Sequence, residues 1–526
     1  MQRTLRLLML VLVALVSAAC QAPAVTPEQE VTASGSAQPS GAITLAYQDE
    51  PPSLDPHVTR SGGRELTLIG ATLVAKDPQS GAYVPYLAKS WTVSDDGLAW
   101  EFTLRDDVTF HNGDPLTAQD YAWTFQRMIE PERQAPAMAA FQALASAEAV
   151  DDTTLRLTLN APYYALLESL ELGFAQPLSQ RAVEEAGDAY GRNPVGTGPF
   201  RFKTWESGNQ IVLERNPDYA WAPAFLQNQD APYLDTLRVR YLPEYATIIA
   251  GLEAGEIDVY DEVQPQDVSM LADAGFQITD ALFAGAFPYL SINVAKTPFD
   301  NVKVRQALNY AIDKDALIKV VMGGQALPQF GPLSQSMHGY APEVESIGYN
   351  YDLERAKSLL AEAGFAEGEL ALVIKAPAIA MFPKVAEVLQ SQLQAAGINA
   401  TIQQGEYGAM VGDAVTGNYD VMVAGYEYTD ADVLHVFFHS SNLGAYNISQ
   451  INDPALDAIL EQLRSETDAS TRQHAAEEAQ RYIVENALVA PLFTPINKIP
   501  VSSRLHDVVI SNSGNRFYFN DAYVTE

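Results

Sequence analysis

Residues 84–125 read VPYLAKSWTVSDDGLAWEFTLRDDVTFHNGDPLTAQDYAWTF, and this stretch predicts short strands followed by a helix. Asp96-Gly97 is a turn dipeptide between two apolar runs, which is typical of a β-hairpin. Asn112-Gly113 predicts a second turn of the same kind. Thr117 is a suitable N-cap for a helix that carries Asp120 to Met128, because its hydroxyl can accept a hydrogen bond from the first turn.

On both sides of this stretch, strand-like and helix-like runs alternate. The strand-like runs are short and β-branched; they are Ile43–Tyr47, Leu155–Leu159, Ile211–Arg215, Leu237–Tyr241, Leu290–Val294, Leu370–Ile374 and Val421–Ala424. The helix-like runs are Val302–Ile312, Lys314–Met322, Leu353–Ala363, Phe382–Ala396, Pro454–Leu463 and Thr471–Glu485. Asp352 is an expected N-cap and Gly364 an expected C′ glycine for the third helix. The alternation predicts an α/β fold.

Glycines also mark a turn in the middle of the chain. The glycines of Gly196-Thr197-Gly198 allow backbone angles with positive φ, which residues with a Cβ avoid. Pro199 lacks an amide hydrogen and ends any helix at this point. These residues are expected to shape the fold.

Composition limits the classes of protein that need to be considered. The chain has 526 residues, of which 47% are hydrophobic, so two or three domains with substantial cores are expected. Its formal charge is −34, with 66 acidic and 32 basic residues. Nucleic acid is a poor partner for such a surface, because binding it depends on Lys and Arg. The acidity is interpreted as a means of solubility, with attraction of cationic ligands and tolerance of a salty or acidic habitat as alternatives.

The N-terminus has the pattern of an export signal over residues 1–20. Arg3 and Arg6 precede the apolar run Leu7–Val16, which is too short to span a bilayer of about 30 Å as a helix. Ser17-Ala18-Ala19 then leads to Cys20, the only cysteine of the chain, so no internal disulfide and no Cys-rich metal site can form. Residues 21–41 are rich in Ala, Pro, Ser, Gln and Thr and predict a flexible tether.

The segment around Cys20 resembles a bacterial lipobox, in which the cysteine receives a diacylglycerol and becomes the new N-terminus. Ser17 stands where the usual leucine would be. Several acyl chains on one residue would anchor the protein stably to a membrane, whereas a single chain would not. The alternative is an ordinary signal with an incidental cysteine.

With residues 84–125, a series of motifs in order resembles the bacterial extracellular solute-binding family 5, which feeds peptide, nickel and some sugar ATP-binding-cassette importers. The resemblance covers residues 43–526. The further motifs are Leu54-Asp55-Pro56-His57, residues 193–200 (NPVGTGPF), 215–219 (RNPDY), 252–258 (LEAGEID) and 304–313 (VRQALNYAID).

This resemblance implies a pear-shaped α/β protein with the type II periplasmic-binding-protein fold, in which two lobes close on a ligand around a two-segment hinge. Lobe I is expected over residues 42–81, 191–289 and 491–526, an extension domain over 82–190, and lobe II over 290–490. The crossings are expected near Leu290–Asn293 and Ala490–Phe493. A monomer that docks on a membrane permease, without a cofactor, is expected.

One wall of the ligand site is implied after the Leu-Asp-Pro-His motif, at Thr59, Arg60, Ser61 and Gly62. Arg60 could bind a ligand carboxylate through two parallel hydrogen bonds, or it could be a solvated loop arginine. Ala137 resembles a position in the extension domain where oligopeptide-binding members can place an aromatic residue. A methyl group there would leave the pocket wider or change its specificity.

The second wall is implied at residues 425–434, GYEYTDADVL. In peptide-binding members an aspartate here pairs with the α-ammonium of the ligand, and Asp430 is the first candidate, with Asp432 as the alternate. Glu427 lies in the same stretch, and Tyr426 and Tyr428 could supply flat apolar walls with hydroxyl groups. The alternative is that both acids cap the helix predicted over Val433–Phe438.

His435 and His439 are spaced to share one helix face and could bind a metal, but no third ligand is evident beside them in the sequence. A structural role and no metal are therefore expected. Motifs of hydrolases and nucleotide-binding enzymes are absent. The sequence predicts a peptide-capturing lipoprotein of an importer. Within the same class, an oligosaccharide held by Tyr426, Tyr428 and Trp205, or chelated nickel, is the alternative; an exported hydrolase is the alternative from another class.

Overall fold

The computed structural model describes residues 41–59, 64–130, 135–513 and 516–525. The predicted signal, the predicted lipidation site at Cys20 and most of the predicted tether lie outside the described residues. Among the described helices, none is both long enough and apolar enough to cross a membrane.

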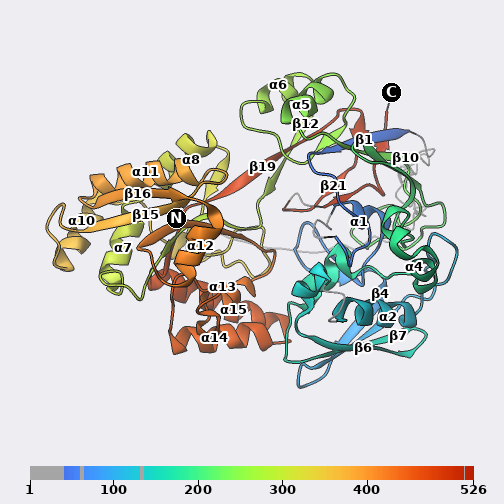
Figure 1. The fold of residues 1–526 in the computed structure, drawn as a ribbon, viewed down its shortest axis with the longest axis horizontal. Helices are drawn as coiled ribbons and strands as arrows, with labels where there is room; N and C mark the ends of the chain where they lie inside the picture. The colour runs from blue at the N-terminus through green and yellow to red at the C-terminus, as the bar shows by residue number, and fades with distance from the viewer. Residues whose placement is uncertain (1–40, 60–63, 131–134, 514–515, 526) are drawn as a thin grey trace, which may run out of the picture. The chain divides into compact units, whose positions relative to one another are not determined.

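The largest sheet has eight strands and contains β1, the first strand of the described chain (Figure 1). Its central strand β1 is parallel to β10 and β11, and β19 runs antiparallel to β11, β12 and β14. The strands are β1 (Ala42–Tyr47), β8 (Phe200–Glu206), β9 (Gln210–Arg215), β10 (Thr236–Tyr241), β11 (Val259–Tyr260), β12 (Gln277–Leu282), β14 (Ala326–Pro328) and β19 (Phe493–Val501). Helices α1 (Arg64–Ile69), α5 (Tyr245–Glu253) and α6 (Val268–Asp273) belong to the same part.

A four-stranded antiparallel sheet contains two strands from residues 84–125 and two from residues 144–159. Its order is β4-β5-β7-β6, and α2 packs on it. The elements are β4 (Ala88–Val93), β5 (Ala99–Leu104), β6 (Leu144–Asp151), β7 (Thr154–Leu159), α2 (Ala118–Ile129), α3 (Leu166–Glu171), α4 (Gln180–Ala186), η2 (Pro136–Phe141), η3 (Gly173–Ala175) and η4 (Gly187–Arg192). Gly97 and Gly113 have φ of 69° and 86°, which confirms both predicted turns.

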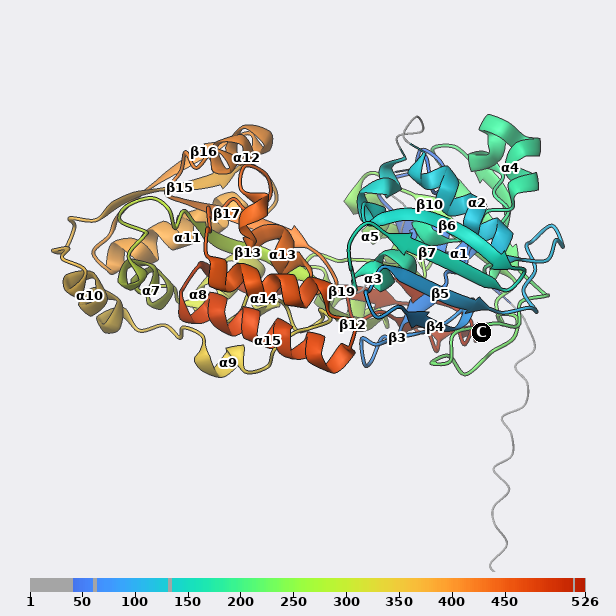
Figure 2. The same cartoon turned by 90° about the horizontal axis from the view of Figure 1, so that it is seen from below.

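The third sheet has the order β16-β15-β17-β13-β18 and mixes parallel and antiparallel pairs. Its strands are β13 (Gly285–Ile292), β15 (Ala371–Pro377), β16 (Asn399–Gly405), β17 (Val421–Glu427) and β18 (Val489–Pro491). Its helices are α7 (Val302–Tyr310), α8 (Lys314–Met322), α9 (Val344–Ile347), α10 (Leu353–Glu362), α11 (Phe382–Ala395), α12 (Tyr407–Val415), α13 (Val433–Phe438), η5 (Ser440–Asn442), α14 (Pro454–Ser465) and α15 (Ala469–Glu485). Figure 2 shows α14 and α15 side by side.

Three short hairpin-like pairs complete the structure: β2 (Val74–Lys76) with β3 (Tyr83–Pro85), β20 (Leu505–His506) with β23 (Tyr523–Val524), and β21 (Val509–Ile510) with β22 (Phe517–Tyr518). The α/β fold predicted from the sequence is confirmed. The expected caps of α10 are also confirmed, because the Asp352 carboxylate accepts from the Arg355 amide and Gly364 has a φ of 93°.

The chain first passes from the eight-stranded to the five-stranded sheet between β12 and β13, adds β14 to the edge of β19, and returns finally between β18 and β19. Pairing of β13 with β17 begins at Gly285, which faces Glu427. The first passage therefore lies a few residues before the crossing predicted near Leu290–Asn293, because the strand is longer than its β-branched part.

Gly196 and Gly198 do not use the positive φ that glycine allows. Both glycines instead lie against the backbone of Ile69 at the end of α1, and the Gly198 amide donates to the Ile69 carbonyl at 2.7 Å. A Cβ on Gly198 would be 2.5 Å from the Ile69 carbonyl carbon. Glycine is needed here for close approach of two backbone segments.

The Leu54-Asp55-Pro56-His57 motif joins the eight-stranded sheet to α2. Arg127 donates to both carboxylate oxygens of Asp55, at 3.1 and 2.7 Å, and its guanidinium lies 2.7 Å from the His57 ring. All three side chains are buried. Burial alone would raise the pKa of Asp55, but the hydrogen bonds and charge of Arg127 outweigh it and lower that pKa.

Candidate functional site

An aromatic pocket of about 270 Å³ lies at the end of β17 in the five-stranded sheet. Its rings come from β13, β17, α11, α12, α13 and the loops that follow β17 and η5. They are Tyr289, Phe382, Tyr407, Tyr426, Tyr428, Phe437 and Tyr446, and we call this group the aromatic pocket.

Tyr426 is the central ring of the aromatic pocket. It is buried, its hydroxyl donates to the Pro332 carbonyl, and its ring stacks on Phe437 with centroids 4.6 Å apart. The Tyr289 ring contacts it from the other side at 5.4 Å. Tyr428 and Tyr446 remain 39% and 60% exposed, so the pocket is open to solvent on their side.

Glu427 places a carboxylate at the aromatic pocket. Its side chain is exposed, yet neighbouring atoms partly desolvate the carboxyl group and raise its pKa, against an opposing effect of the Arg64 charge. Arg64 begins α1, pairs with Asp261 at 2.6 Å and lies over the Tyr47 ring at 4.5 Å. A cationic group of a ligand could therefore pair with Glu427 without displacing a protein partner that the described residues record.

Asp430 is fully buried and already paired. Both its carboxylate oxygens accept from the Arg472 guanidinium of α15, and His338 Nδ1 lies 3.3 Å from Oδ2. The Asp432 amide donates to Asp430 Oδ1 at 2.8 Å. Burial would raise the pKa of Asp430, but the charges of Arg472 and His338 lower it strongly. Asp430 is therefore ionised.

Asp432 has the same kind of partner. Arg464 of α14 donates to both its carboxylate oxygens, at 2.9 and 2.7 Å. Asp432 precedes α13, but its side chain makes no capping hydrogen bond. The two aspartates thus fix the start of α13 against α14 and α15, because unpaired charges in this buried position would be costly.

The remaining predicted site residues are less informative. Thr59 is fully buried after the Asp55 turn. Ala137 belongs to the short helix η2. Arg60, Ser61 and Gly62 lie outside the described residues.

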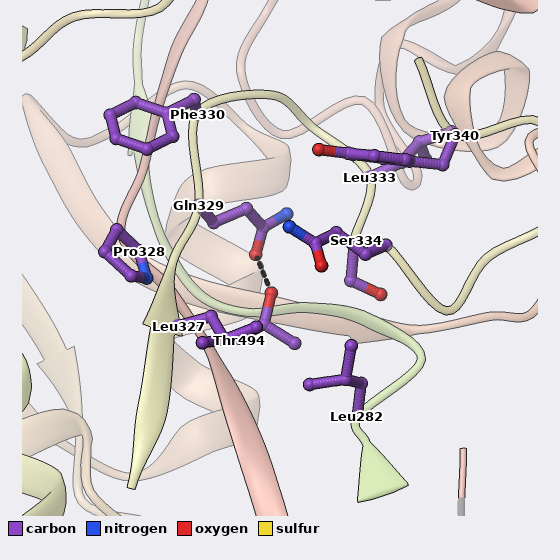
Figure 3. Close-up of a pocket in the computed structure, with 10 residues that line it drawn as sticks. Leu282, Leu327, Pro328, Gln329, Phe330, Leu333, Ser334, Tyr340 and Thr494 are labelled. Carbon is purple, nitrogen blue, oxygen red and sulfur yellow. Dashed lines mark hydrogen bonds between the residues drawn. The ribbon is translucent and has the colours of Figure 1, made fainter. Parts of the chain in front are cut away.

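A much smaller cavity lies where the chain passes between the two large sheets (Figure 3). It holds about 10 Å³ and is lined by Leu282, Leu327 and Thr494, among others. Thr494 Oγ1 donates to Gln329 Oε1 at 3.1 Å. This space is enough for one water molecule at most, so the aromatic pocket is the candidate ligand site.

Sequence reasoning found Tyr426, Glu427 and Tyr428 because they are contiguous. It missed Tyr289, Tyr407 and Tyr446, which reach the aromatic pocket from separate elements, and no pattern within the sequence relates them. It also missed Arg464 and Arg472. The only feature of the sequence that could have indicated these partners is the presence of an arginine within or next to each of the two helices predicted after residue 450.

A comparison with models of protein families identifies the family of this chain. Residues 82–445 match the bacterial extracellular solute-binding proteins, family 5 (middle region). The chain belongs to this family.

Relatives of family 5 cover most of the chain. Heme-binding protein A of Haemophilus influenzae is 31% identical, over 82% of this chain and 83% of its own. Di/tripeptide-binding protein 2 of Pseudomonas aeruginosa is 30% identical, over 81% of this chain and 83% of its own. The solved structure of HbpA2 from Haemophilus parasuis covers 92% of this chain and 100% of its own, with 25% identity and a TM-score of 0.84. The type II periplasmic-binding-protein fold is thereby confirmed, and the chain is the solute-binding component of an ATP-binding-cassette importer.

Proposed function

We propose that this family 5 protein captures peptides outside the cytoplasmic membrane and delivers them to the permease of its importer. The observation that carries the proposal is the aromatic pocket with Glu427 beside it. Tyrosine and phenylalanine rings suit the apolar side chains of a peptide, and a carboxylate suits its α-ammonium group. A relative that spans most of the chain is named a di/tripeptide-binding protein, which supports the same ligand class.

Within this site, Tyr426 and Tyr428 form the apolar wall and Glu427 meets the ammonium group. The prediction that Asp430, or alternatively Asp432, is the ammonium partner remains untested. An ammonium group could reach Asp430 only in exchange for its present bonds to Arg472. Thr59, Arg60, Ser61, Gly62 and Ala137 remain predicted contacts on the opposite wall.

The rest of the proposal concerns the whole protein. Lipidation of Cys20 anchors the chain to the membrane, the 21–41 segment is a tether, and the protein acts as a monomer without catalytic activity. The lobes, with the boundaries predicted from the sequence, close on the peptide by hinge motion and shift the population toward the closed form.

The oligosaccharide alternative is less well supported. Of its three predicted rings, Trp205 lies on β8 in the other large sheet, with the Arg192 guanidinium 3.8 Å from its centroid. It also donates to Glu50 at 2.6 Å. Trp205 therefore does not line the aromatic pocket with Tyr426 and Tyr428, and the three rings do not form one sugar platform.

Calorimetric titration with a panel of di- and tripeptides tests the proposal. We expect Glu427→Gln to weaken binding of the best peptide at least about tenfold, about 1.4 kcal/mol, because the amide loses the charge that pairs with the ammonium group. Glu354→Gln, at an exposed position on α10, is the matched control and should bind like the wild type. Unchanged affinity of Glu427→Gln would contradict the role of Glu427.

Two further measurements separate the remaining possibilities. Asp430→Asn leaves the Arg472 charge buried without a partner and should lower stability by about 3–5 kcal/mol, so its peptide affinity is measured where circular dichroism shows it to be folded. Unchanged affinity there would remove Asp430 from the site. Thermal stabilisation by oligosaccharides or nickel chelates, and by no peptide, would contradict peptide capture.

A further inference from the structure

His435 lies on α13 and His439 directly follows the end of this helix, and both face Glu461 of α14. Their rings are nearly parallel, with centroids 4.2 Å apart and an angle of 9°. Glu461 Oε1 lies 3.1 Å from His439 Nε2 and 3.8 Å from His435 Nε2. One donor atom from each residue falls within 4.8 Å of the other two. Glu461 therefore places a third donor atom beside the two histidines, which the sequence did not reveal.

Two of the histidine nitrogens lack a hydrogen-bond partner within the described part of the chain. They are His435 Nδ1 and His439 Nε2, and the two residues are only 5% and 7% exposed. A buried polar atom without a partner is unfavourable, and native structures rarely leave one without a reason. His439 Nε2 is also one of the atoms that faces Glu461.

The charge around the two rings favours a cation. Glu461 places one carboxylate beside the two rings, with Oε1 3.1 Å from His439 Nε2. Asp457, also on α14, adds a second carboxylate with Oδ1 3.8 Å from His439 Nε2. The positive charge of Arg464 is matched by Asp432.

We propose that His435, His439 and Glu461 bind a divalent transition-metal ion of the zinc type, which joins α13 to α14. Two imidazoles and one carboxylate are a common ligand set for Zn²⁺, whereas Ca²⁺ and Mg²⁺ need more oxygen ligands. Ligand bonds of about 2.1 Å place neighbouring donor atoms of a tetrahedral site roughly 3.4 Å apart, which lies between the two Glu461 distances. The ion requires the parallel rings to tilt toward each other.

Ser441 affects metal binding by His439 in two opposing ways, through its hydroxyl and through its backbone amide, which both lie at Nδ1 of the ring. The Ser441 amide donates to Nδ1 at 3.0 Å, which leaves the ring proton on Nε2 in the metal-free protein. When Nε2 binds the ion, this proton moves to Nδ1, and the Ser441 hydroxyl at 2.8 Å accepts from it. Such a hydrogen bond to the outer nitrogen orients a metal-binding imidazole. The Ser441 amide, however, loses Nδ1 as its acceptor, and this loss reduces the affinity for the metal ion.

The position of the ion connects it to the aromatic pocket. Phe437 lies between the two histidines in sequence and stacks on Tyr426, while the histidines face α14. Glu461 is 62% exposed, so solvent reaches the site and a water molecule can complete the coordination. The ion would stabilise the position of α13, the helix whose Phe437 lines the aromatic pocket.

Titration of the full-length chain with Zn²⁺ and with Ni²⁺ tests the site, in buffer with about 150 mM salt to screen the acidic surface and excess Mg²⁺ to occupy weak carboxylate sites. We expect one saturable site, and a higher midpoint of thermal unfolding that a chelator reverses. Glu461→Ala should weaken binding at least about tenfold while the protein stays folded, because this side chain is exposed. His439→Gln should do the same.

The exposed pair of His474 and Glu477 on α15, with Nδ1 and Oε2 3.3 Å apart, is the matched control. His474→Gln should leave the affinity and the stoichiometry unchanged. Absence of a saturable site for either metal would overturn the proposal. Binding by Glu461→Ala with wild-type affinity would overturn it as well, because the ion would then lie elsewhere on the acidic surface.

Discussion

At the residue scale, most buried charges of this protein are arranged in pairs. Arg127 with Asp55, Arg472 with Asp430 and Arg516 with Glu171 are buried ion pairs. Lys314 differs, because it is buried and has no carboxylate partner among the described residues. Its ammonium group donates to the Gln329 carbonyl at 2.8 Å and lies 4.3 Å from the centre of the Phe330 ring.

Burial lowers the pKa of Lys314 to about 7, well below the ordinary value of a lysine. The unfolded chain therefore binds more protons than the folded one between about pH 7 and pH 10, and the contribution of this residue to stability rises with pH across that window. We expect Lys314→Met to remove this rise, which amounts to roughly 2–4 kcal/mol. Urea unfolding at pH 7 and pH 9 measures it.

Lys319, an exposed residue of the same helix α8, provides the control. Lys319→Met should change the free energy of unfolding equally at both pH values. If Lys314→Met and the wild type gain the same stability between pH 7 and pH 9, Lys314 is charged in the folded protein and the prediction is wrong.

At the element scale, close approach of two backbones decides where glycine is needed. The turn after residue 195 lies directly on the end of α1, so Gly198→Ala forces the turn and the helix apart. We expect a loss of about 1–3 kcal/mol in the free energy of unfolding, the range of overpacked sites. Differential scanning calorimetry or urea unfolding measures the loss.

Gly412→Ala is the matched control, because Gly412 lies inside α12 and a Cβ there would meet nothing within 4 Å. This change should stabilise the protein by roughly 0.5–1 kcal/mol, since alanine loses less backbone entropy in a helix. A Gly198→Ala protein as stable as the wild type would show that the turn can move away from Ile69.

Local patterns predicted the elements well and the site only in part. The bounds of α8 and α13 agree with the sequence prediction. Capping by Asp313 and Gly323 defines α8 locally, whereas Asp432 makes no capping hydrogen bond at the start of α13. The aromatic pocket depends on Tyr407 and Tyr446, and the proposed metal site depends on Glu461 of α14. Such residues come together only when separate helices and strands pack, and a single sequence contains no signal for that packing.

At the scale of the whole molecule, a polar contact joins the part around the four-stranded sheet to the five-stranded part, in addition to the two strand connections. The Thr429 amide donates to Glu168 of α3 at 3.0 Å, and the Thr429 hydroxyl donates to the same oxygen. Lys76 donates to the Thr429 carbonyl at 2.9 Å. Tyr164 lies 4.5 Å from the Arg472 guanidinium, and its amide donates to the Arg464 carbonyl.

Glu168 makes this contact sensitive to pH. Burial first, and then the Asp430 charge, raise the pKa of Glu168 to about 7, although Lys76 and the Thr429 bonds oppose the rise. The folded chain thus holds a proton that the unfolded chain loses above about pH 4.5, and the contribution of Glu168 to stability falls as pH rises from about 4.5 to 7.

Glu168→Gln keeps the shape of this side chain and removes its charge, so the variant should gain stability relative to the wild type as pH rises through that window. The expected gain is on the order of 1–3 kcal/mol between pH 5 and pH 8, measured by urea unfolding. Glu171 lies on the same helix as Glu168 and forms an ion pair with Arg516. Glu171→Gln should therefore destabilise the protein at both pH values. A constant difference between Glu168→Gln and the wild type across the window would mean that Glu168 is ionised throughout, and the contact would then hold equally at every pH where the importer works.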